Sequence, residues 1–430
     1  MNAYFHTLGC KVNQYETQAM RRLLEEQGYT TAEFSVGQPD MGEAVLVINS
    51  CTVTGESDRK LRQLLRRLRR EHPQATIVLT GCYPQAFPTE AEALPEPNVL
   101  LGNATRLDLA ERLEEFLRTR QKVTAIGTHP KTYEPLSICE FQGRTRAFVK
   151  IEDGCDRFCS YCIIPYARGR VRSKPIDELA AEAERLAAQG YAEIVLVGIN
   201  LTAYGKDNGL SICDAVEAAA RPVGIRRVRL GSIEPDHLSD ETIRRLAQCE
   251  KLCPQFHLAL QSGCDATLKR MNRHYDTAEY RAICEKLRAV FPHCAITTDI
   301  MVGFPGETEE DFETSLAFAR EIAFSRMHCF PYSRRAGTVA AKAAEQLPQA
   351  EKLRRNKRMI ALEKEMREAY ESALVGKTVS VLTETVLPDG RCDGYTDTYV
   401  PVIVSGAAPG ELACVRITAY ENGTCVGEIV

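Results

Sequence analysis

Three cysteines in one short stretch carry the strongest chemical signal in the sequence. They stand in Cys155-Asp-Arg-Phe-Cys159-Ser-Tyr-Cys162, at C-x3-C-x2-C spacing, just after a strand-like run. Three thiolates from one loop suit a cubane iron–sulfur cluster, because each iron takes one thiolate and one iron is left open. Zinc is the alternative, but structural zinc takes four ligands, and no fourth cysteine or histidine follows at knuckle spacing.

Three further cysteines lie upstream and far apart in the chain. They occur in Gly9-Cys10-Lys11-Val12-Asn13-Gln14, Asn49-Ser50-Cys51-Thr52 and Gly81-Cys82-Tyr83-Pro84, each directly after a predicted strand. The carboxyl ends of parallel strands meet at one edge of a sheet, so these thiols can converge. The residues alone leave that interpretation open beside a second one, three buried and inert thiols.

Alternating strand and helix patterns surround the upstream cysteines. Strand-like runs at Ala3–Leu8, Ala44–Asn49 and Ala75–Thr80 alternate with helical patterns at Asn13–Gln27 and Glu56–Arg70. This alternation predicts a parallel sheet with helices packed on it.

A second alternating series follows a Pro-rich stretch at Thr128–Pro135, which we interpret as a linker. Six βα units fall short of the eight of a closed barrel, so we expect an open, partial (β/α)6 barrel. Its strand-like runs are Ala147–Ile151, Glu193–Ile199, Arg226–Gly231, Phe256–Gln261, Ala295–Val302 and Met327–Tyr332.

In the C-terminal region, after a charged helical connector at Leu353–Ser372, the sequence pattern changes from helical to strand-like. Its β-branched runs, broken by Gly, Pro and Asp, predict a small all-β barrel or sandwich. These runs are Thr378–Thr383, Tyr399–Val404, Glu411–Ala419 and Cys425–Val430. We therefore expect an α/β protein of three domains, at 1–128, 141–370 and 374–430.

Composition narrows the class of protein. The chain has 430 residues, 44% apolar and 26% charged, which is globular and excludes a disordered or fibrous protein. No run approaches the ~18 apolar residues of a membrane span, and the first residues do not resemble a secretory signal. We therefore expect a cytoplasmic protein without a membrane partner. Its 17 cysteines are then not a disulfide framework, and a net charge of −4 argues against a generic polyanion binder.

The cysteine spacing, Tyr161 before the last cysteine and the βα alternation resemble the radical S-adenosylmethionine (SAM) superfamily. The resemblance implies a [4Fe–4S] cluster on Cys155, Cys159 and Cys162, whose open iron chelates the amino and carboxylate groups of SAM. One electron then cleaves SAM to methionine and a 5′-deoxyadenosyl radical. The protein holds the cofactor and excludes water and competing donors.

The three upstream motifs, the radical SAM loop and the small C-terminal β domain together resemble the methylthiotransferase family over essentially the whole chain. This implies a second [4Fe–4S] cluster on Cys10, Cys51 and Cys82, where the sulfur to be transferred resides, and an RNA-binding TRAM domain at the C-terminus. One SAM would methylate that sulfur, and the radical from another would abstract hydrogen from an adenine, which then takes the methylthio group. The reaction requires both clusters to face one cavity, between the N-terminal domain and the barrel mouth.

The motif from Gly9 to Glu16 is most similar to the branch that modifies carbon 2 of threonylcarbamoyladenosine beside the tRNA anticodon. The isopentenyl branch usually shows Gln-Met-Asn after its first cysteine, and the branch that modifies a ribosomal-protein aspartate shows Pro-Lys-Asn. Both remain alternatives, as does a non-catalytic, cluster-bearing RNA-binding or redox-sensing protein. The expected partners are tRNA and an electron donor such as flavodoxin or ferredoxin.

Charge offers a physical test of RNA binding. The helical stretch at 59–70 holds seven basic residues and no acid, which favours phosphate contact over an ordinary solvated face. The seven are Arg59, Lys60, Arg62, Arg66, Arg67, Arg69 and Arg70. Four more cations alternate near the radical SAM loop, which in an extended segment aims them one way; pairing with acids of the barrel is the alternative. These four are Arg168, Arg170, Arg172 and Lys174.

The C-terminal domain has the opposite balance. From Leu374 onward three basic residues face seven acidic ones, so the domain is a poor unaided phosphate anchor. RNA binding there would depend on shape, on the neighbouring surface, or on aromatic contacts from residues such as Tyr395 or Tyr399.

Further candidates follow the barrel strands, where such folds place their ligands. By resemblance to related enzymes, a Gly-rich segment after the second strand meets the amino group of SAM, an acid after the third bonds its ribose, and the last strands form a wall on the adenine side. Each residue is alternatively an ordinary turn or hydrogen-bonding residue. They are Gly198, Asn200, Glu234, Gln261, Asp299 and Gly303. Arg335 resembles a family motif without an assigned role.

Overall fold

The structure, a computed structural model, describes residues 1–35, 37–38, 41–138 and 145–430. These residues form two compact units, each built from separate parts of the chain. The first comprises the described part of Met1–Gln142, with Glu152–Lys174 and Ser333–Ala341. The second comprises the described part of Gly143–Ile151, with Pro175–Tyr332 and Lys342–Val430. The three domain boundaries expected from the sequence remain a prediction.

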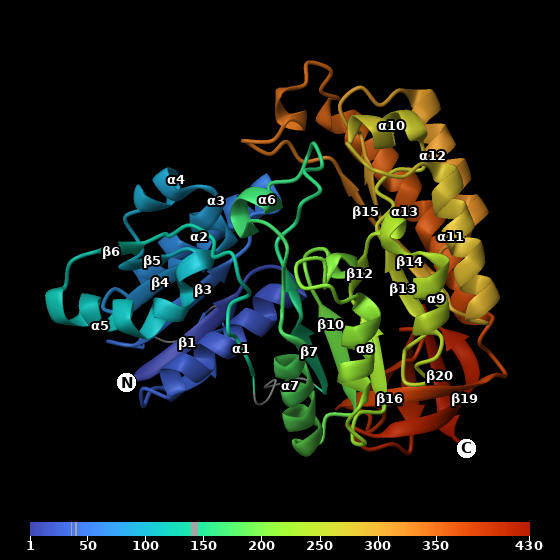
Figure 1. The fold of residues 1–430 in the computed structure, drawn as a ribbon, viewed down its shortest axis with the longest axis horizontal. Coiled ribbons are helices and arrows are strands. Elements are labelled where there is room, and N and C mark those ends of the chain that lie inside the picture. Colours follow the sequence, from blue (N-terminus) through green and yellow to red (C-terminus); the bar gives the residue numbers. More distant parts are fainter. Residues whose placement is uncertain (36, 39–40, 139–144) are drawn as a thin grey trace. The chain divides into compact units, whose positions relative to one another are not determined.

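A six-stranded parallel sheet forms the centre of the first unit, in the order β2-β1-β3-β4-β5-β6 (Figure 1). Its strands are β1 (Asn2–Thr7), β2 (Thr30–Glu33), β3 (Val45–Ser50), β4 (Thr76–Gly81), β5 (Val99–Leu101) and β6 (Val123–Ala125). Its helical elements are α1 (Lys11–Glu25), α2 (Gly55–Glu71), α3 (Cys82–Ala86), α4 (Pro88–Glu92), η1 (Asn103–Asp108) and α5 (Leu109–Thr119).

Alternation along the strands gives this sheet two buried faces. On one face Phe5 and Val47 pack with residues of α1 and α5, including Leu113. On the other face Leu46 and Ile48 pack with the leucines of α2. Every residue of β3 is buried, as expected of a central parallel strand covered on both sides.

The radical SAM loop also belongs to the first unit. A short antiparallel pair, β8 (Glu152–Asp153) with β9 (Arg172–Ser173), closes its base, and α6 (Ile164–Arg168) lies inside the loop. The Pro-rich stretch predicted to be a linker has no regular structure, and the chain just after it is anchored. The Leu136 carbonyl accepts hydrogen bonds from the Tyr15 hydroxyl at 2.8 Å and from Lys174 Nζ at 2.9 Å.

The second unit contains the predicted open barrel of parallel strands. Two pairing series, β11-β10-β7 and β12-β13-β14-β15, are joined through Gly231, whose amide pairs with Leu196 of the neighbouring strand. The strands are β7 (Arg146–Lys150), β10 (Glu193–Val197), β11 (Arg227–Leu230), β12 (Ser232–Ile233), β13 (Gln255–Leu258), β14 (Ala295–Val302) and β15 (Arg326–Pro331). The surrounding helices include α7 (Ile176–Ala188), α8 (Ile212–Ala220), α9 (Asp240–Leu246), α10 (Asp265–Arg270), α11 (Thr277–Val290), α12 (Glu309–Ile322) and α13 (Gln349–Ser372).

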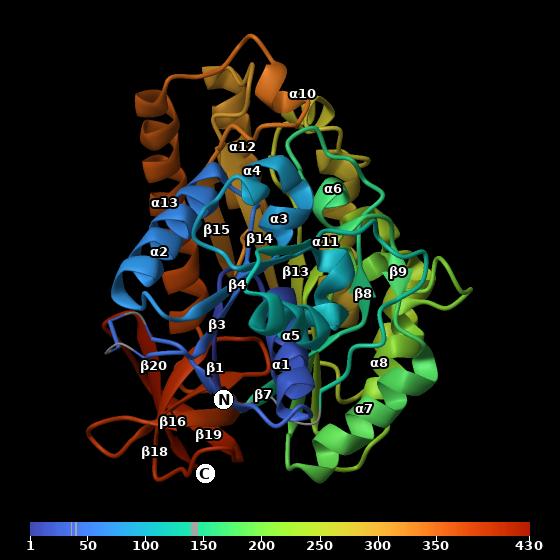
Figure 2. The same cartoon turned by 90° about the vertical axis from the view of Figure 1, so that its left-hand side faces the viewer.

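A closed five-stranded barrel ends the chain, in the order β16-β17-β18-β20-β19 (red in Figure 2). Its strands are β16 (Thr378–Val386), β17 (Cys392–Thr396), β18 (Pro401–Ser405), β19 (Leu412–Glu421) and β20 (Thr424–Ile429). The barrel alternative of the sequence prediction is therefore confirmed, and β17 is a strand that the prediction missed. At Gly394 of β17 any side chain would collide with the backbone of Leu382 and Thr383, so the tight crossing requires glycine.

Buried arginines fasten this small barrel to the parallel barrel. Glu193 pairs with Arg229 at 2.8 Å and with Arg227 at 3.6 Å. Both arginines also donate to backbone carbonyls of the small barrel, including those of Tyr395 and Thr396. Burial alone would raise the pKa of Glu193, but the surrounding arginines, Arg229 above all, lower it, so the carboxylate stays charged.

The two tyrosines suggested as RNA contacts, Tyr395 and Tyr399, lie at this same contact between the two barrels. Tyr395 and Tyr399 stack at 4.9 Å between ring centroids, and the guanidinium of Arg146 lies 4.6 Å from the Tyr395 ring. Arg229 lies 4.9 Å from the Tyr399 ring. These rings stabilise the packing of the two barrels, which the sequence could not reveal because their partners come from distant strands.

Candidate active site

Cys10, Cys51 and Cys82 follow β1, β3 and β4, which are neighbours in the sheet. Cys10 caps the start of α1, and Cys82 is the first residue of α3. The first two loops lie in close contact, since a Cβ on Gly9 would stand 2.8 Å from Cys51 Cβ. The structure thus brings three cysteines that are distant in sequence to one edge of the sheet.

An amide network holds this edge together. The thiol of Cys10 donates to Asn13 Oδ1 at 3.2 Å. The Asn13 amide donates in turn to Asn49 Oδ1 at 3.2 Å and to the Ser50 carbonyl at 3.1 Å. The loop after β1 and the loop after β3 are therefore coupled through one buried side chain. Both asparagines occur in the quoted cysteine motifs, but no local pattern in the sequence indicates that they contact each other.

The three thiols influence one another electrostatically. The pKa of Cys51 is raised to about 11, first by burial and then by the neighbouring thiols of Cys82 and Cys10, while the guanidinium of Arg168 opposes the change. A metal that binds here must displace protons, since thiolates are the ligands. The positive charge of Arg168 favours that thiolate form.

The second cysteine set lies in a loop whose ends meet. The amide of Cys155 donates to the Gly169 carbonyl at 3.0 Å, and the amide of Cys162 donates to the Cys159 carbonyl at 2.9 Å. Gly154 has φ +88°, and a Cβ there would overlap the Arg170 carbonyl. Glycine at this position therefore lets the two ends of the loop close.

Two side chains connect the cysteine sets. Asn103 donates to Cys82 Sγ at 3.5 Å and to the Ala167 carbonyl in α6 at 2.7 Å. Arg168, at the end of α6, donates to Asn13 Oδ1 at 3.1 Å, the atom that also accepts from Cys10. Both sets thus lie in one compact unit and share a hydrogen-bond network. Asn103 was not singled out from the sequence, because it belongs to no recognisable metal motif, and Arg168 was considered only as one of four alternating cations.

Three of the four alternating cations are structural, so the expectation that they all face RNA is wrong. Arg168 is fully buried and pairs with Glu16 at 2.7 Å and Asp153 at 3.1 Å. Arg172 and Lys174 are also buried, with Asp153 at 3.5 Å from Arg172 and the Tyr15 hydroxyl at 3.2 Å from Lys174. The alternative of ion pairing holds for Arg168 and Arg172, but their acids come from α1 and β8 of the first unit rather than from the parallel barrel.

The role of Arg335 becomes visible in the structure. Its guanidinium is buried, forms an ion pair with Asp58 and a hydrogen bond with Thr52, next to Cys51, and lies 4.4 Å from the Phe87 ring. The segment Ser333–Ala341 also reaches the other cysteine set, because the Ala340 amide donates to the Ser160 carbonyl at 2.8 Å. Arg335 therefore anchors a segment that contacts both cysteine loops.

The basic helix α2 is only partly available for RNA. Arg69 donates to the carbonyls of Ala75 at 2.9 Å and Glu96 at 2.7 Å, so its charge fastens the chain after the helix. Other side chains are more exposed, with 71% for Arg66 and 76% for Arg70. Acids at the helix ends, such as Glu71, form exposed pairs with them, and such pairs are weak.

The predicted SAM contacts lie in the second unit, most of them beyond the carboxyl ends of its strands, while Asp299 lies within β14. Gly198 and Asn200 follow β10, and Asn200 accepts a hydrogen bond from Thr202 at 3.4 Å. The Thr202 hydroxyl accepts from the Glu234 amide at 3.1 Å, which links the ends of neighbouring strands. Gln261 donates its amide to the Asp299 carbonyl at 2.8 Å.

Two of these acids already have protein partners. Glu234 forms an ion pair with Arg273. Asp299 lies 3.3 Å from His257 Nε2. Burial raises the pKa of Asp299, but the hydrogen bond and charge of His257 outweigh it, so the net shift is downward. The Asp299 carboxylate is therefore favoured in the charged form, ready to accept hydrogen bonds.

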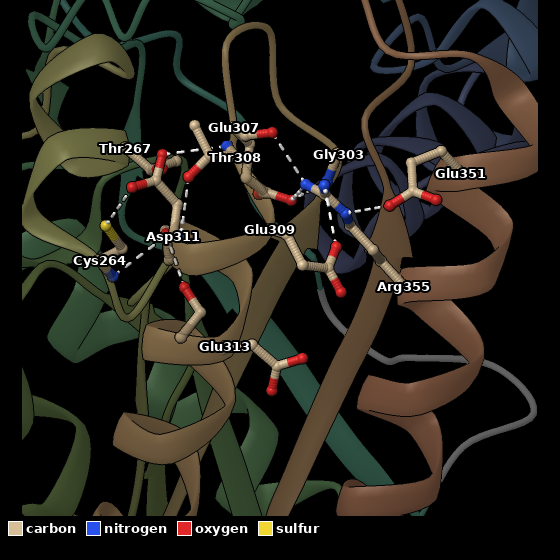
Figure 3. A network of polar contacts seen from close by, with 12 residues as sticks. Cys264, Thr267, Gly303, Glu307, Thr308, Glu309, Asp311, Glu313, Glu351 and Arg355 are labelled. Carbon is tan, nitrogen blue, oxygen red and sulfur yellow. Dashed lines mark hydrogen bonds and ion pairs between the residues drawn. The ribbon is translucent and has the colours of Figure 1, made fainter.

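Gly303 has a packing role of its own (Figure 3). Its φ is +70°, and the place of a Cβ is filled by Lys352 of α13. Its amide donates to Glu307 at 2.9 Å, and Glu307 pairs with Arg355 at 2.6 Å. The positive φ and the close approach of Lys352 explain why residue 303 is a glycine, and neither depends on a bound cofactor.

Comparisons with known proteins extend over the whole chain. Residues 2–102 match an uncharacterized protein family, UPF0004, residues 149–319 match the radical SAM superfamily, and residues 372–430 match the TRAM domain. The threonylcarbamoyladenosine tRNA methylthiotransferase MtaB of Bacillus subtilis is 37% identical over 96% of this chain and 93% of its own. The Thermotoga maritima protein of that name is also 37% identical, over 97% of this chain and 94% of its own.

This chain belongs to the tRNA methylthiotransferase family. Its members on the isopentenyl side are also similar: a Clostridium botulinum tRNA-2-methylthio-N(6)-dimethylallyladenosine synthase is 32% identical over 99% of this chain and 96% of its own. The prediction of a methylthiotransferase, most like the threonylcarbamoyl branch, is confirmed.

Solved structures support the fold. The radical SAM methyltransferase TsrM from Kitasatospora setae, with cobalamin and a [4Fe-4S] cluster bound, superimposes with a TM-score of 0.56 at 12% identity, over 79% of this chain and 74% of its own. The cobalamin-dependent enzyme OxsB, with SAM bound, gives 0.52 at 13% identity, over 85% and 61%.

The cysteines of this methylthiotransferase suit clusters better than a single ion. Among the described residues, no group of three His, Cys, Asp or Glu side chains could hold one metal ion. A cubane makes a different demand, because each thiolate binds its own iron. Two sets of three thiols, one from a closed loop and one from three strand ends, meet that demand in donor type and number.

Proposed function

We propose that this protein transfers a methylthio group to carbon 2 of threonylcarbamoyladenosine beside the anticodon of tRNA. The family membership supports the reaction class, and the relatives that carry this name support the substrate. The observation that carries the proposal is the bridging of two cysteine sets within one compact unit by Asn103 and Arg168. A transfer from one centre to a radical formed at another needs both centres near one substrate atom.

The cysteine sets would hold the two [4Fe–4S] clusters, with Cys155, Cys159 and Cys162 in one and Cys10, Cys51 and Cys82 in the other. When bound, these groups supply a radical from SAM at the first centre and the methylthio sulfur at the second. The chain contributes the fixed loop ends, the buried charge of Arg168 and the amide network around Asn13. These loop ends and side chains orient the thiolates.

For SAM itself we propose the residues at the strand ends of the second unit: Gly198 and Asn200 toward the amino group, Glu234 toward the ribose, and Gln261 and Asp299 toward the adenine. Two observations support this assignment: the strand ends are linked by hydrogen bonds, and both acids are held charged or paired. For tRNA we propose the exposed cations of α2. An electron donor such as flavodoxin or ferredoxin and a cytoplasmic location complete the proposal. Among the described helices none is both long and apolar enough to cross a bilayer.

The test is mass spectrometry of tRNA nucleosides from cells that lack the gene, complemented with wild type, Cys51→Ala or Cys159→Ala. We expect 2-methylthio-threonylcarbamoyladenosine to disappear, its precursor to accumulate, and only the wild type to restore it. Loss of the isopentenyl product instead would transfer the assignment to that branch. An unchanged tRNA profile would contradict a tRNA substrate and direct the search to a ribosomal-protein aspartate. If the protein also forms no 5′-deoxyadenosine with SAM and reductant, it is a non-catalytic cluster protein.

A further inference from the structure

Two aromatic rings lie exposed beside the radical SAM cysteines. Phe158 precedes Cys159 directly, and Tyr166 follows Cys162 within α6. Their ring centroids are 6.3 Å apart at an interplanar angle of 87°. The relative exposure is 39% for Phe158 and 54% for Tyr166, values unusual for such large side chains.

A guanidinium completes this group. Arg170 lies 4.8 Å from the centroid of the Phe158 ring, and its side chain is 72% exposed. Its ion pair with Asp156, at 3.2 Å, is itself exposed on both sides and contributes little. Arg168, Arg172 and Lys174 are buried, so Arg170 is the cation of this stretch that the loop presents outward. We call Phe158, Tyr166 and Arg170 the aromatic ledge.

The backbone at Phe158 is strained. Its φ is +50°, in the left-handed region that bulky side chains rarely adopt. Such a conformation is unfavourable and persists where the surrounding structure imposes it, which is common at functional sites. In this loop the strained conformation holds an exposed aromatic ring next to Cys159.

We propose that the aromatic ledge stacks unpaired RNA bases next to the adenine that is modified. Tyr166 and the outer plane of Arg170 provide the contact surfaces, and Phe158 supports both. The inference rests on the proposed function and names a part of its substrate site. Single-stranded RNA is recognised mainly by stacking of splayed bases on aromatic rings and guanidinium planes, the chemistry that the ledge offers.

A redox protein is the other class of partner that a surface beside a cluster could receive. Docking of an acidic electron carrier depends on a broad positive patch. Arg170 forms an ion pair with Asp156, and the other two members of the ledge, Phe158 and Tyr166, are exposed uncharged rings. The composition of the ledge therefore favours bases over an acidic protein.

The experiment measures binding of the full-length, cluster-loaded protein to an RNA hairpin of the anticodon stem and loop that carries threonylcarbamoyladenosine. The variants are Tyr166→Leu, which removes the ring but keeps apolar volume, and Arg170→Lys, which keeps the charge but removes the plane. Tyr166→Phe is the matched control, because it keeps the ring. Iron content and thermal unfolding verify that each variant is intact.

We expect Tyr166→Leu to weaken hairpin binding about tenfold and Tyr166→Phe to bind as the wild type does. Arg170→Lys should weaken binding by a smaller factor, about threefold, because lysine cannot stack as a plane. The dependence of affinity on salt should stay the same in each variant, since stacking releases no counterions. A fully paired duplex should show no difference between wild type and variants.

Three results would contradict the proposal that the aromatic ledge stacks RNA bases. Tyr166→Leu could bind the hairpin as tightly as the wild type does. It could bind more weakly but with a flatter salt dependence, which would indicate a phosphate contact. It could also leave RNA affinity unchanged while slowing cluster reduction by reduced flavodoxin, which would assign the surface to an electron donor. A wild-type protein that binds the hairpin but never modifies it would contradict the proposed function and leave the stacking result intact.

Discussion

The two cysteine sets are built in opposite ways. Cys155, Cys159 and Cys162 come from one loop, whose ends are closed by local contacts such as the Cys155 amide with the Gly169 carbonyl. Cys10, Cys51 and Cys82 are separated by whole βα units and meet only because β1, β3 and β4 are neighbours in one sheet. The first set therefore depends on loop closure and the second on the sheet. Damage to either scaffold should impair one set and spare the other.

Removal of a single cysteine should have the largest effect and should separate the two sets. Cys51→Ala and Cys159→Ala should each lose about half of the bound iron, because each set holds one cluster of the same size. Both should abolish methylthiolation, but Cys51→Ala should still cleave SAM with reductant while Cys159→Ala should not. Iron analysis and chromatography of 5′-deoxyadenosine measure this. Loss of SAM cleavage in Cys51→Ala would contradict the separation.

Two glycines test the scaffolds rather than the ligands. Gly81 has φ +102° and lies against the Ser50 carbonyl, while Gly154 has φ +88° and lies against the Arg170 carbonyl. A methyl group cannot fit at either position without a backbone shift, so each alanine should cost about 2–4 kcal/mol. Gly81→Ala should lose iron from the upstream set, and Gly154→Ala from the loop.

The control for both is Gly28→Ala. Gly28 has φ +82° but has no atom within 4 Å of a built Cβ, so alanine there carries only the backbone strain, about 1 kcal/mol. Denaturant unfolding and iron content distinguish the three variants. Equal losses of iron from both sets in Gly81→Ala would mean that the scaffolds are not independent.

Arg335 tests the connection between the sets. Arg335→Met leaves Asp58 buried without its ion pair, which should cost about 3 kcal/mol. It should also lower the rate of methylthiolation about tenfold, because the segment anchored by Arg335 contacts both cysteine loops. The neighbouring Arg334 is exposed and bonds only a backbone carbonyl within the described residues, so Arg334→Met is the matched control. The rate of methylthiolation and the free energy of unfolding in urea are measured for both variants.

The smallest expected effect is a pH dependence of the unfolding free energy, caused by His129 beside the radical SAM loop. His129 packs against Gly169, and burial, with help from Arg172, lowers its pKa from 6.5 to about 4. The folded state favours the neutral ring, so its contribution to stability is complete above about pH 6.5 and is lost as the pH falls toward 4. His129→Phe should flatten the fall in unfolding free energy over this range. A variant as acid-sensitive as the wild type would exclude His129 as the cause.

Much of the fold follows from the sequence because its strong patterns are local. The runs of β1, β3 and β4 were recognised from their apolar residues, and the six barrel strands from their alternation with helical stretches. The short strands β2, β5 and β6 were missed, since strands of three or four residues carry too little periodicity.

In the candidate site, too, local features could be predicted from the sequence and long-range contacts could not. The spacing of the loop cysteines is a local property and was readable directly. The partners of Arg168 and Arg335 lie 152 and 277 residues away in the chain, at Glu16 and Asp58, and no local pattern reports such pairs. For this reason the sequence left open whether Arg168 faces outward or pairs with acids, whereas the fold uses its charge in the interior.

The chain enters the first unit three times, with Glu152–Lys174 and Ser333–Ala341 as its later returns. An N-terminal fragment ending before residue 152 would leave Glu16 without Arg168, Asp58 without Arg335 and Tyr15 without Lys174. Such a fragment should not fold stably into the unit seen here, because Asp58 would be buried without its ion pair and Glu16 would keep Arg106 but not Arg168. Cutting the protein at its apparent domain borders therefore removes parts of the very site that the N-terminal region carries, and dissection has to proceed by point substitution in the intact chain.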